Sequence, residues 1–417
     1  MIEDLITFIA RRRSKIYLRF IPSNDMGLPI SRGDTPKLLY CHIPFCEELC
    51  PYCSFHRVVF KRELAIPYFD ALRKEVMMYK ALGYDFQAVY IGGGTPTVMM
   101  DELEKTIELL RANFSVKEVS TETNPNHLTP HNLKRLKEMG VNRLSVGVQT
   151  FDDEILKAIG RFYKSGSGDE IAERLKETEG IFDTLNADMI FNFPTQTVKA
   201  LERDLSILNQ IKIGQVTYYP LMVSNYASEA MAKTMGKVDY KRGDRFYSII
   251  LDALSMDYLP TTAWCFSRKR GMIDEYVVNF DEYAGLGSGS IGYLDGVAYA
   301  NTFDIREYIE KINRGIFPLA GKRAFSLKEK LSYDLLMKLF GLKLNLRSIE
   351  EKHRVSLKRY MWQELLFFVL TRALRQKDGW LYLTRKGQYY WVIMMREFFI
   401  GVNNFRDYCR ALVGEKN

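Results

Sequence analysis

The sequence predicts an α/β protein built on a parallel sheet with helices on its outer side. Two observations predict this class: short β-rich runs alternate with stretches of helical period, and the alternation repeats about six times after Pro36. Repeated strand–helix–strand units need right-handed crossovers, which place the helices outside a parallel sheet. With 417 residues, 47% of them hydrophobic, the chain can bury a large core. Periodicity alone leaves both a barrel and an open sheet possible.

The strand candidates are short runs rich in β-branched and aromatic residues. They cover residues 37–43, 88–91, 118–123, 143–148, 187–191 and 215–219. Amphipathic segments of helical period lie between most of them, and no internal repeat interrupts the pattern. These strands therefore define a core that we expect to span residues 37–230.

The rhythm changes after about residue 230. Long helical patterns cover 239–255 and 326–339, with the glycine-rich stretch 285–292 between them. Residues 380–386 alternate apolar and polar side chains before an aromatic and methionine-rich helix over 388–412. We expect a mainly helical, winged-helix-like C-terminal domain.

Four parts follow from these patterns. They are an N-terminal arm at 1–36, the core at 37–230, an extension of the core with a glycine-rich, substrate-side segment at 231–320, and the helical domain at 321–417. The arm has apolar residues at helical spacing and then four basic residues between 11 and 15. It is either a helix packed on the core with a solvated basic end or a surface helix that contacts anionic lipid.

The composition of the sequence limits the cellular location and the partners that we expect. The formal charge is +8, from 59 basic and 51 acidic residues, and no basic patch with interleaved aromatics marks a nucleic-acid module. No apolar run approaches the roughly 20 residues of a membrane span, and the first 13 residues lack a small-residue cleavage site. We expect a cytoplasmic protein, with a peripheral position on the inner membrane face as a further option, and no nucleic-acid partner.

The cysteines indicate a metal centre. Cys46, Cys50 and Cys53 form a C-x3-C-x2-C triplet, while Cys265 and Cys409 stand alone far downstream. In a reducing compartment such crowding favours metal binding over disulfides. Structural zinc needs four ligands, which would have to include residues 41 and 42, whereas three thiolates suit a [4Fe-4S] cluster with one open iron.

The segment Tyr40 to Cys53, reading YCHIPFCEELCPYC, resembles the signature of radical S-adenosylmethionine (SAM) enzymes. It is most similar to the branch named for oxygen-independent coproporphyrinogen III oxidase. The resemblance implies a partial (β/α)6 radical SAM barrel and a [4Fe-4S] cluster held by Cys46, Cys50 and Cys53, whose open iron is chelated by SAM. Cys41 departs from the usual aliphatic residue and is interpreted as a spectator thiol.

Further motifs extend the resemblance. YIGGGTP at 90–96 is similar to the family's glycine motif, ETNP at 122–125 and RLSVGVQTF at 143–151 resemble the next strand ends, and ADMIFNFP at 187–194 resembles the fifth strand. At residue 192 an asparagine replaces the usual glycine. The SAM contacts that the resemblance implies are Tyr40, Gly92, Gly93, Gly94, Thr95, Glu122, Gln149, Arg161 and Asp188.

The family resemblance implies that a one-electron donor, such as flavodoxin or ferredoxin, drives cleavage of SAM to a 5′-deoxyadenosyl radical. The segments 264–268, 285–289, 299–303 and 390–399 resemble a methylase subgroup that acts on menaquinone. We therefore expect a class C-like radical SAM C-methyltransferase that uses a second SAM molecule to methylate C8 of the menaquinone ring.

Two alternatives from the same branch remain open. One is a coproporphyrinogen III dehydrogenase that decarboxylates its substrate oxidatively, and the other is a heme chaperone without turnover. The substrate is accordingly an isoprenoid quinone or a tetrapyrrole. For proton removal the candidates are Tyr40, Asp274 and Glu275, with the tyrosines at 218 and 219 as further options.

Overall fold

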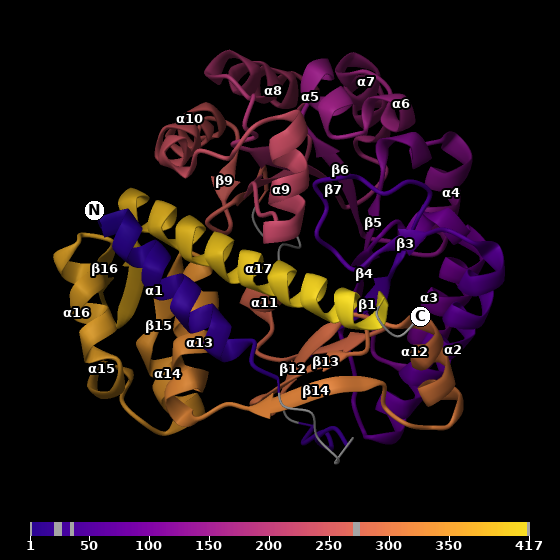
Figure 1. Cartoon of the computed structure of the whole chain (residues 1–417). Helices are drawn as coiled ribbons and strands as arrows, with labels where there is room; N and C mark the ends of the chain where they lie inside the picture. The colour runs from indigo at the N-terminus through magenta and orange to yellow at the C-terminus, as the bar shows by residue number, and fades with distance from the viewer. Residues whose placement is uncertain (1, 21–26, 34–36, 270–275, 415–417) are drawn as a thin grey trace.

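A computed structural model describes residues 2–20, 27–33, 37–269 and 276–414. One sheet of twelve strands forms the centre of the molecule, in the order β14-β13-β12-β11-β1-β4-β5-β6-β7-β8-β10-β9 (Figure 1). The predicted α/β fold with a parallel core is confirmed. The four-part domain division stays a prediction.

Six central strands run parallel, and each lies beside the next. They are β1 (Leu38–Ile43), β4 (Ala88–Gly93), β5 (Glu118–Thr123), β6 (Arg143–Gln149), β7 (Thr184–Phe191) and β8 (Gln215–Pro220). The helices that connect them are α2 (Arg62–Ala81), α3 (Met100–Asn113), α4 (Pro130–Glu138), α5 (Asp153–Ala158), α6 (Phe162–Ser165), α7 (Gly168–Thr178) and α8 (Val198–Ile211). The carboxyl ends of all six strands therefore meet at one edge, where α/β proteins place their chemistry.

The sheet is extended on both sides by strands that the sequence pattern did not predict. Beyond β8 lie β10 (Cys265–Ser267) and β9 (Leu259–Pro260), after the helices α9 (Asn225–Thr234) and α10 (Gly243–Leu254). Beyond β1 lie β11 (Tyr283–Leu286), β12 (Ile291–Leu294), β13 (Val297–Asn301) and β14 (Leu319–Ala324), with the helices α11 (Tyr276–Asn279) and α12 (Ile305–Asn313). These strands have two to six residues each, so they are too short to show a clear period of two.

The C-terminal region is mainly helical, as expected. Its helices are α13 (Leu327–Phe340), α14 (Leu346–His353), α15 (Leu357–Tyr360), α16 (Trp362–Leu370) and α17 (Arg385–Gly414). Three short strands, β15 (Lys343–Asn345), β17 (Trp380–Leu383) and β16 (Leu374–Lys377), form a separate antiparallel sheet beside them.

The first helix of the chain lies along the last one. α1 (Ile2–Tyr17) is longer than the apolar pattern at its start suggested, because basic residues continue the helix, and it runs beside α17 across the front of the molecule (Figure 1). Gly401 of α17 lets Ser14 of α1 approach closely. No helix in the described ranges combines the length and the apolar composition that a membrane span needs.

Candidate functional site

The three clustered cysteines line one cavity at the carboxyl edge of the parallel strands. Cys46 ends the two-residue strand β2 (Phe45–Cys46), which follows β1 and pairs with β3 (Val58–Val59). The Cys46 sulfur accepts a hydrogen bond from the Thr95 hydroxyl at 3.7 Å, and the Cys50 sulfur accepts one from Arg161 Nη1 at 3.9 Å. Cys53 is tied back into the loop by its backbone N–H, which donates to the Cys50 carbonyl at 3.1 Å.

This donor set fits an iron–sulfur cluster. Burial and, to a smaller extent, the neighbouring Cys53 raise the pKa of the Cys46 thiol to about 11, so this thiol needs a bound cation to ionise near neutral pH. In the described part of the chain no three Cys, His, Asp or Glu side chains stand as a ready-made metal site. The three thiols nevertheless share one cavity, and two of them meet N–H or O–H donors of the kind that surround cluster sulfurs.

Cys41 lies apart from the triplet. It is fully buried on β1 in the hydrophobic core, and burial raises the pKa of its thiol. Cys265 is likewise buried, on β10, and does not line the cavity.

The glycine motif brings the end of β4 against a buried carboxylate. Glu122, near the end of β5, accepts hydrogen bonds from the Tyr90 hydroxyl at 2.5 Å and from the Gly93 N–H at 2.9 Å. A Cβ at Gly92 would lie 2.7 Å from the Glu122 carboxylate, and one at Gly93, whose φ is +114°, would lie 2.5 Å from the His42 ring. Glycine is therefore required at both positions. Burial raises the pKa of Glu122, whereas the two hydrogen bonds that it accepts and the charges of Arg143 and Arg406 oppose the rise.

A polar network joins the cysteine loop to the ends of β5 and β6. Arg161 donates from Nη2 to the Asn124 side-chain oxygen at 2.9 Å and to the Gly147 carbonyl, while its buried Nε has no hydrogen-bond partner among the described residues. Asn124 in turn donates to the Thr95 hydroxyl at 2.8 Å. Gln149, with a positive φ of 78°, lines the same cavity. An unsatisfied buried guanidinium N–H is expected to meet a ligand acceptor.

Asp188 lies on the next strand, β7, and also lines the cavity. It accepts hydrogen bonds from the Ser145 hydroxyl at 2.8 Å and from the Asn186 amide at 2.9 Å. Burial raises the pKa of Asp188 to about 7, and Arg143 opposes the rise. Its protonation therefore changes near neutral pH.

Tyr40 is not among the residues that line this cavity. Its hydroxyl donates to His42 Nδ1 at 2.9 Å, and His42 Nε2 donates to the His56 carbonyl at 2.8 Å. Burial lowers the pKa of His42 to about 4, so the ring is neutral, and burial raises the pKa of Tyr40. The structure thus gives Tyr40 a neutral phenol with a fixed partner, and its role in catalysis stays a prediction. Asp274 and Glu275 lie outside the described residues.

The structure brings together all but two of the predicted SAM contacts. The cavity lining includes Gly93, Gly94, Thr95, Glu122, Gln149, Arg161 and Asp188 together with the three cysteines, whereas Gly92 and Tyr40 are not among the lining residues. These assignments stay predictions about ligand contact.

Several cavity residues were missed at the sequence level. Asn124 lies inside a quoted motif and could have been found there. Arg57 follows the cysteine loop, and Phe399 and Asn403 come from α17, where Asn403 donates to the Met222 carbonyl at 2.8 Å. No short-range pattern links α17 to a loop about 350 positions earlier.

Comparisons with known proteins agree with this geometry. A family model described as the radical SAM superfamily matches residues 40–208. The heme chaperone HemW of Bacillus subtilis (strain 168) is 28% identical over 369 residues, which cover 84% of this chain and 96% of that protein. HemW of Buchnera aphidicola subsp. Acyrthosiphon pisum is 30% identical over 62% of this chain and 70% of that protein.

Oxidases of tetrapyrrole synthesis are similar as well. The oxygen-independent coproporphyrinogen III oxidase of Helicobacter pylori (strain ATCC 700392 / 26695) is 28% identical over 80% of this chain and 79% of that protein. The solved structure of coproporphyrinogen III oxidase (HemN) from Escherichia coli matches with a TM-score of 0.74 at 23% identity, over 87% of this chain and 90% of that chain. This match confirms the radical SAM fold with a helical C-terminal region.

These comparisons correct one expectation. The prediction that the chain methylates C8 of menaquinone is wrong, because the relatives over most of its length are named as heme chaperones and coproporphyrinogen III oxidases. The glycine-rich and aromatic segments that suggested the methylase fall at strands β10, β11 and β13 and in the packed helix α17. The second SAM molecule, which only methyl transfer required, stays untested.

The fold, the shared cavity and these relatives lead to one assignment, with the [4Fe-4S] cluster and SAM that it implies. The chain belongs to the radical SAM superfamily, in the branch that contains the coproporphyrinogen III oxidase HemN and the heme chaperone HemW.

Proposed function

We propose that the chain is a radical SAM enzyme that binds a tetrapyrrole with carboxylate arms and decarboxylates an arm oxidatively, in the manner of an oxygen-independent coproporphyrinogen III oxidase. The names of its relatives support a tetrapyrrole ligand. The observation that carries the proposal is the cavity beyond the predicted SAM contacts, where an apolar wall lies beside a cation with an unused donor.

The apolar wall suits a flat macrocycle. Phe55, Leu221, Met222 and Phe399 line it, and Phe55 is exposed. The Arg406 guanidinium carbon lies 4.8 Å from the centre of the Phe55 ring and packs over it. Burial of ring surface against such a wall supplies most of the binding free energy, and a few polar groups then orient the ligand.

Arg57 is the proposed carboxylate anchor. It lines the cavity and donates from Nη2 to the Cys50 carbonyl, and its buried Nε has no partner among the described residues. A guanidinium binds a carboxylate through two parallel N–H groups, so this unused donor favours a carboxylate arm over a neutral substituent. Lys164 also lines the cavity, where it lies 3.6 Å from Glu47.

In the proposed reaction a hydrogen atom leaves the propionate carbon next to the pyrrole ring. Carbon dioxide and one electron then leave, and a vinyl group remains. The cluster and SAM, when bound, supply the radical that takes the hydrogen atom. A one-electron donor such as flavodoxin or ferredoxin reduces the cluster, and a one-electron acceptor takes the electron from the substrate. The chain's own residues bind the arm, hold SAM and exclude water.

A heme chaperone is the second candidate, because the chain matches 96% of the length of B. subtilis HemW but 79% of the H. pylori oxidase. This candidate needs a side chain in the cavity that can bind the heme iron as an axial ligand. Among the described residues that line the cavity there is no histidine. His42 and His56 are buried with hydrogen-bonded partners, and His353 is bound to Asp334 at 2.6 Å.

The test is an anaerobic incubation of the reconstituted, reduced protein with SAM and coproporphyrinogen III, followed by mass spectrometry. Loss of carbon dioxide from the porphyrinogen together with 5′-deoxyadenosine supports the oxidase. An unchanged porphyrinogen with stoichiometric binding of heme supports the chaperone instead. Absence of both results would refute both candidates.

A matched pair of variants tests the anchor. Arg57→Gln should raise the KM for the porphyrinogen while iron content stays unchanged. Arg62→Gln, at an exposed position at the start of α2, is the control and should leave KM unchanged. Equal KM values in the two variants would remove Arg57 from the substrate site.

A further inference from the structure

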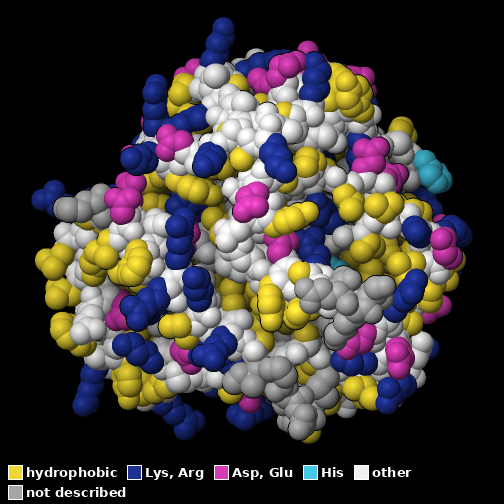
Figure 2. Space-filling view, in the orientation of Figure 1, with side chains coloured by type: hydrophobic (Ala, Val, Ile, Leu, Met, Phe, Trp, Pro, Cys, Tyr) yellow, Lys and Arg dark blue, Asp and Glu magenta, His cyan; other side chains and the backbone are white. Residues whose placement is uncertain are grey.

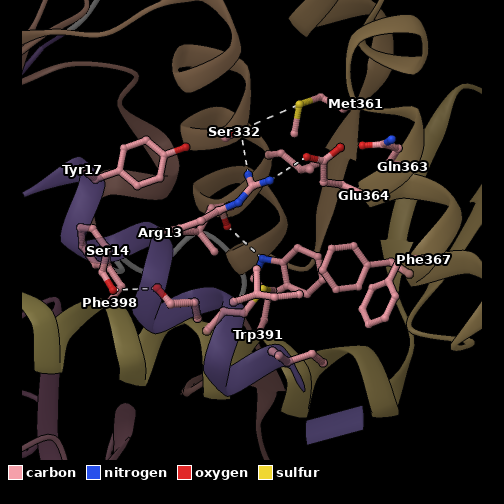
Figure 3. Close-up of a pocket in the computed structure, with 17 residues that line it drawn as sticks. Arg13, Ser14, Tyr17, Ser332, Met361, Gln363, Glu364, Phe367, Trp391 and Phe398 are labelled. Carbon is pink, nitrogen blue, oxygen red and sulfur yellow. Dashed lines mark hydrogen bonds and ion pairs between the residues drawn. The ribbon is translucent and has the colours of Figure 1, made fainter. Parts of the chain in front are cut away.

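A second, mostly apolar groove lies between α1, α13, α16 and α17 (Figure 3). Its volume is about 330 Å³, which is within the usual range of small-molecule sites, about 300–1,000 Å³. The apolar lining comes from all four helices and includes Ile6, Ile9, Leu335, Phe367, Trp391 and Phe398. It shares no lining residue with the cysteine cavity. The groove is therefore a separate candidate site.

Arg13, Glu364 and Ser332 form a polar cluster in the wall of the groove. Arg13 Nη2 lies 2.9 Å from Glu364 Oε1, and its other nitrogen donates to the Ser332 hydroxyl at 3.5 Å (Figure 3). Trp391 donates its indole N–H to the Leu336 carbonyl at 3.0 Å, which fixes the orientation of the ring where it lines the groove. Arg13 pairs with Glu364, and most of the other residues that line the groove are apolar.

The surface around the groove is apolar as well. On α16 the side chains of Trp362, Leu366, Val369 and Leu370 are exposed, Leu370 by 73%. On α1 the side chains of Leu5, Phe8, Ile9 and Ile16 are exposed, Phe8 by 62%. Figure 2 shows hydrophobic side chains gathered over α16 at the left edge of the molecule, with Lys and Arg side chains beside them over α1. An exposed apolar surface of this extent marks a protein or membrane contact.

The charges on α1 favour a membrane. Arg12 and Lys15 are exposed and lie among the exposed apolar residues of the same helix, and Arg19 is exposed just after its end. Apolar side chains with interleaved Lys and Arg are typical of helices that lie in the interface of an anionic bilayer. The acidic residues of α1, Glu3 and Asp4, stand at its first turn, away from Arg12 and Lys15.

We propose that the face formed by α1 and α16 docks on an anionic phospholipid bilayer and that the groove takes one acyl chain of a bound phospholipid. The basic residues of α1 hold the phosphate group, and the acyl chain of the phospholipid enters between α1 and α16 towards Trp391. This site is independent of the proposed tetrapyrrole reaction, because neither the groove nor its rim contributes a residue to the cysteine cavity.

The experiment uses the fluorescence of Trp391, which lines the groove. Trp362 and Trp380 are replaced by Phe in the full-length protein, so that Trp391 and Trp264 remain; Trp264 is fully buried. The protein is mixed with phosphatidylglycerol vesicles whose acyl chains carry bromine, which quenches tryptophan only on near contact. Quenching that disappears when Trp391 is also replaced by Phe is the expected result.

Two further variants separate docking from chain entry. Arg12→Gln with Lys15→Gln should weaken partitioning onto the vesicles by roughly 30-fold, at about 1 kcal/mol for each basic residue near the surface. The matched control is Lys134→Gln with Lys137→Gln, two exposed lysines of α4, and it should partition as the parent does. Ala10→Phe fills the groove and should abolish the quenching while partitioning persists.

Each outcome tests a different part of the proposal. Partitioning without quenching of Trp391 would overturn the acyl-chain site, and absence of partitioning would overturn the docking face as well. Equal partitioning onto neutral phosphatidylcholine vesicles would overturn the role of Arg12 and Lys15. If Ala10→Phe fails to fold, the comparison with and without Trp391 still decides the question, and none of these results depends on turnover of a porphyrinogen.

Discussion

Replacing Glu122 by Gln removes one negative charge from the cavity and almost no volume. The carboxylate receives the Tyr90 hydroxyl and the Gly93 N–H, and the open cavity lies on its remaining side. If Glu122 binds the amino group of SAM, as the family resemblance implies, the contact joins an ammonium to a carboxylate in a buried site. Hydrogen bonds to charged groups contribute about 1.5–3 kcal/mol, so E122Q should weaken SAM binding by about 10- to 150-fold.

We expect E122Q to lower the stability of the folded state by less than it lowers the binding free energy of SAM. The amide of Gln keeps one oxygen that can accept from the Gly93 N–H, and the Tyr90 hydroxyl can turn to accept from the amide nitrogen. We expect the free energy of unfolding to fall by about 1 kcal/mol or less. The loss of SAM affinity would then be larger than any loss of stability.

The assay is equilibrium binding of SAM to the cluster-reconstituted protein without oxygen, with iron content measured on the same sample. Glu118→Gln is the matched control, because Glu118 begins the same strand and does not line the cavity. An E122Q protein with full iron content and the affinity of the parent would refute the assignment of Glu122 to SAM.

Three further predictions concern the same site. Alanine at position 46, 50 or 53 should abolish the brown absorbance and bound iron, whereas C41A should keep both; iron retained in any of the first three would contradict the ligand set. G93A should lower the free energy of unfolding in urea more than G180A does. Both positions need a positive φ, which costs an alanine roughly 1–3 kcal/mol, but only a Cβ at residue 93 would meet the His42 ring. Equal losses in the two variants would disprove that contact. Burial raises the pKa of Asp188 to about 7, so the folded state favours its protonated form. The contribution of Asp188 to the free energy of unfolding is therefore full below about pH 4 and is lost as the pH rises to about 7. D188N should remove this contribution, and parallel stability curves for parent and variant across that range would show that Asp188 does not titrate there.

The core of the fold was predictable because its strands are buried on both faces. Such strands read as continuous β-rich runs, and the run at 118–123 coincides with β5. The strands β11 to β14 were missed because they have only four to six residues each, and their stability comes from packing that no local pattern encodes. α1 was predicted too short because the apolar pattern weakens after residue 10 while the helix continues.

The site was predictable where its residues belong to one local motif. The cysteine spacing, the glycines at 92 and 93, and Glu122 each follow or end a strand, and parallel strands bring their ends together. Asn403 could not be found in this way, because it enters the cavity from α17 through a long-range contact, and Arg57 and Met222 belong to no motif although they follow the cysteine loop and the end of β8. The substrate was the weakest inference, since loose similarity of packed segments says little about what a cavity binds.

α17 contributes lining side chains to both cavities. Its 30 residues form one helix of about 45 Å, and consecutive side chains serve different sites: Phe398 lines the lipid groove and Phe399 lines the cysteine cavity. A rigid rod that is displaced at one end transmits the movement to the other. If lipid binding shifts α17, thermodynamic reciprocity requires SAM binding to change lipid affinity by the same factor as lipid changes SAM affinity.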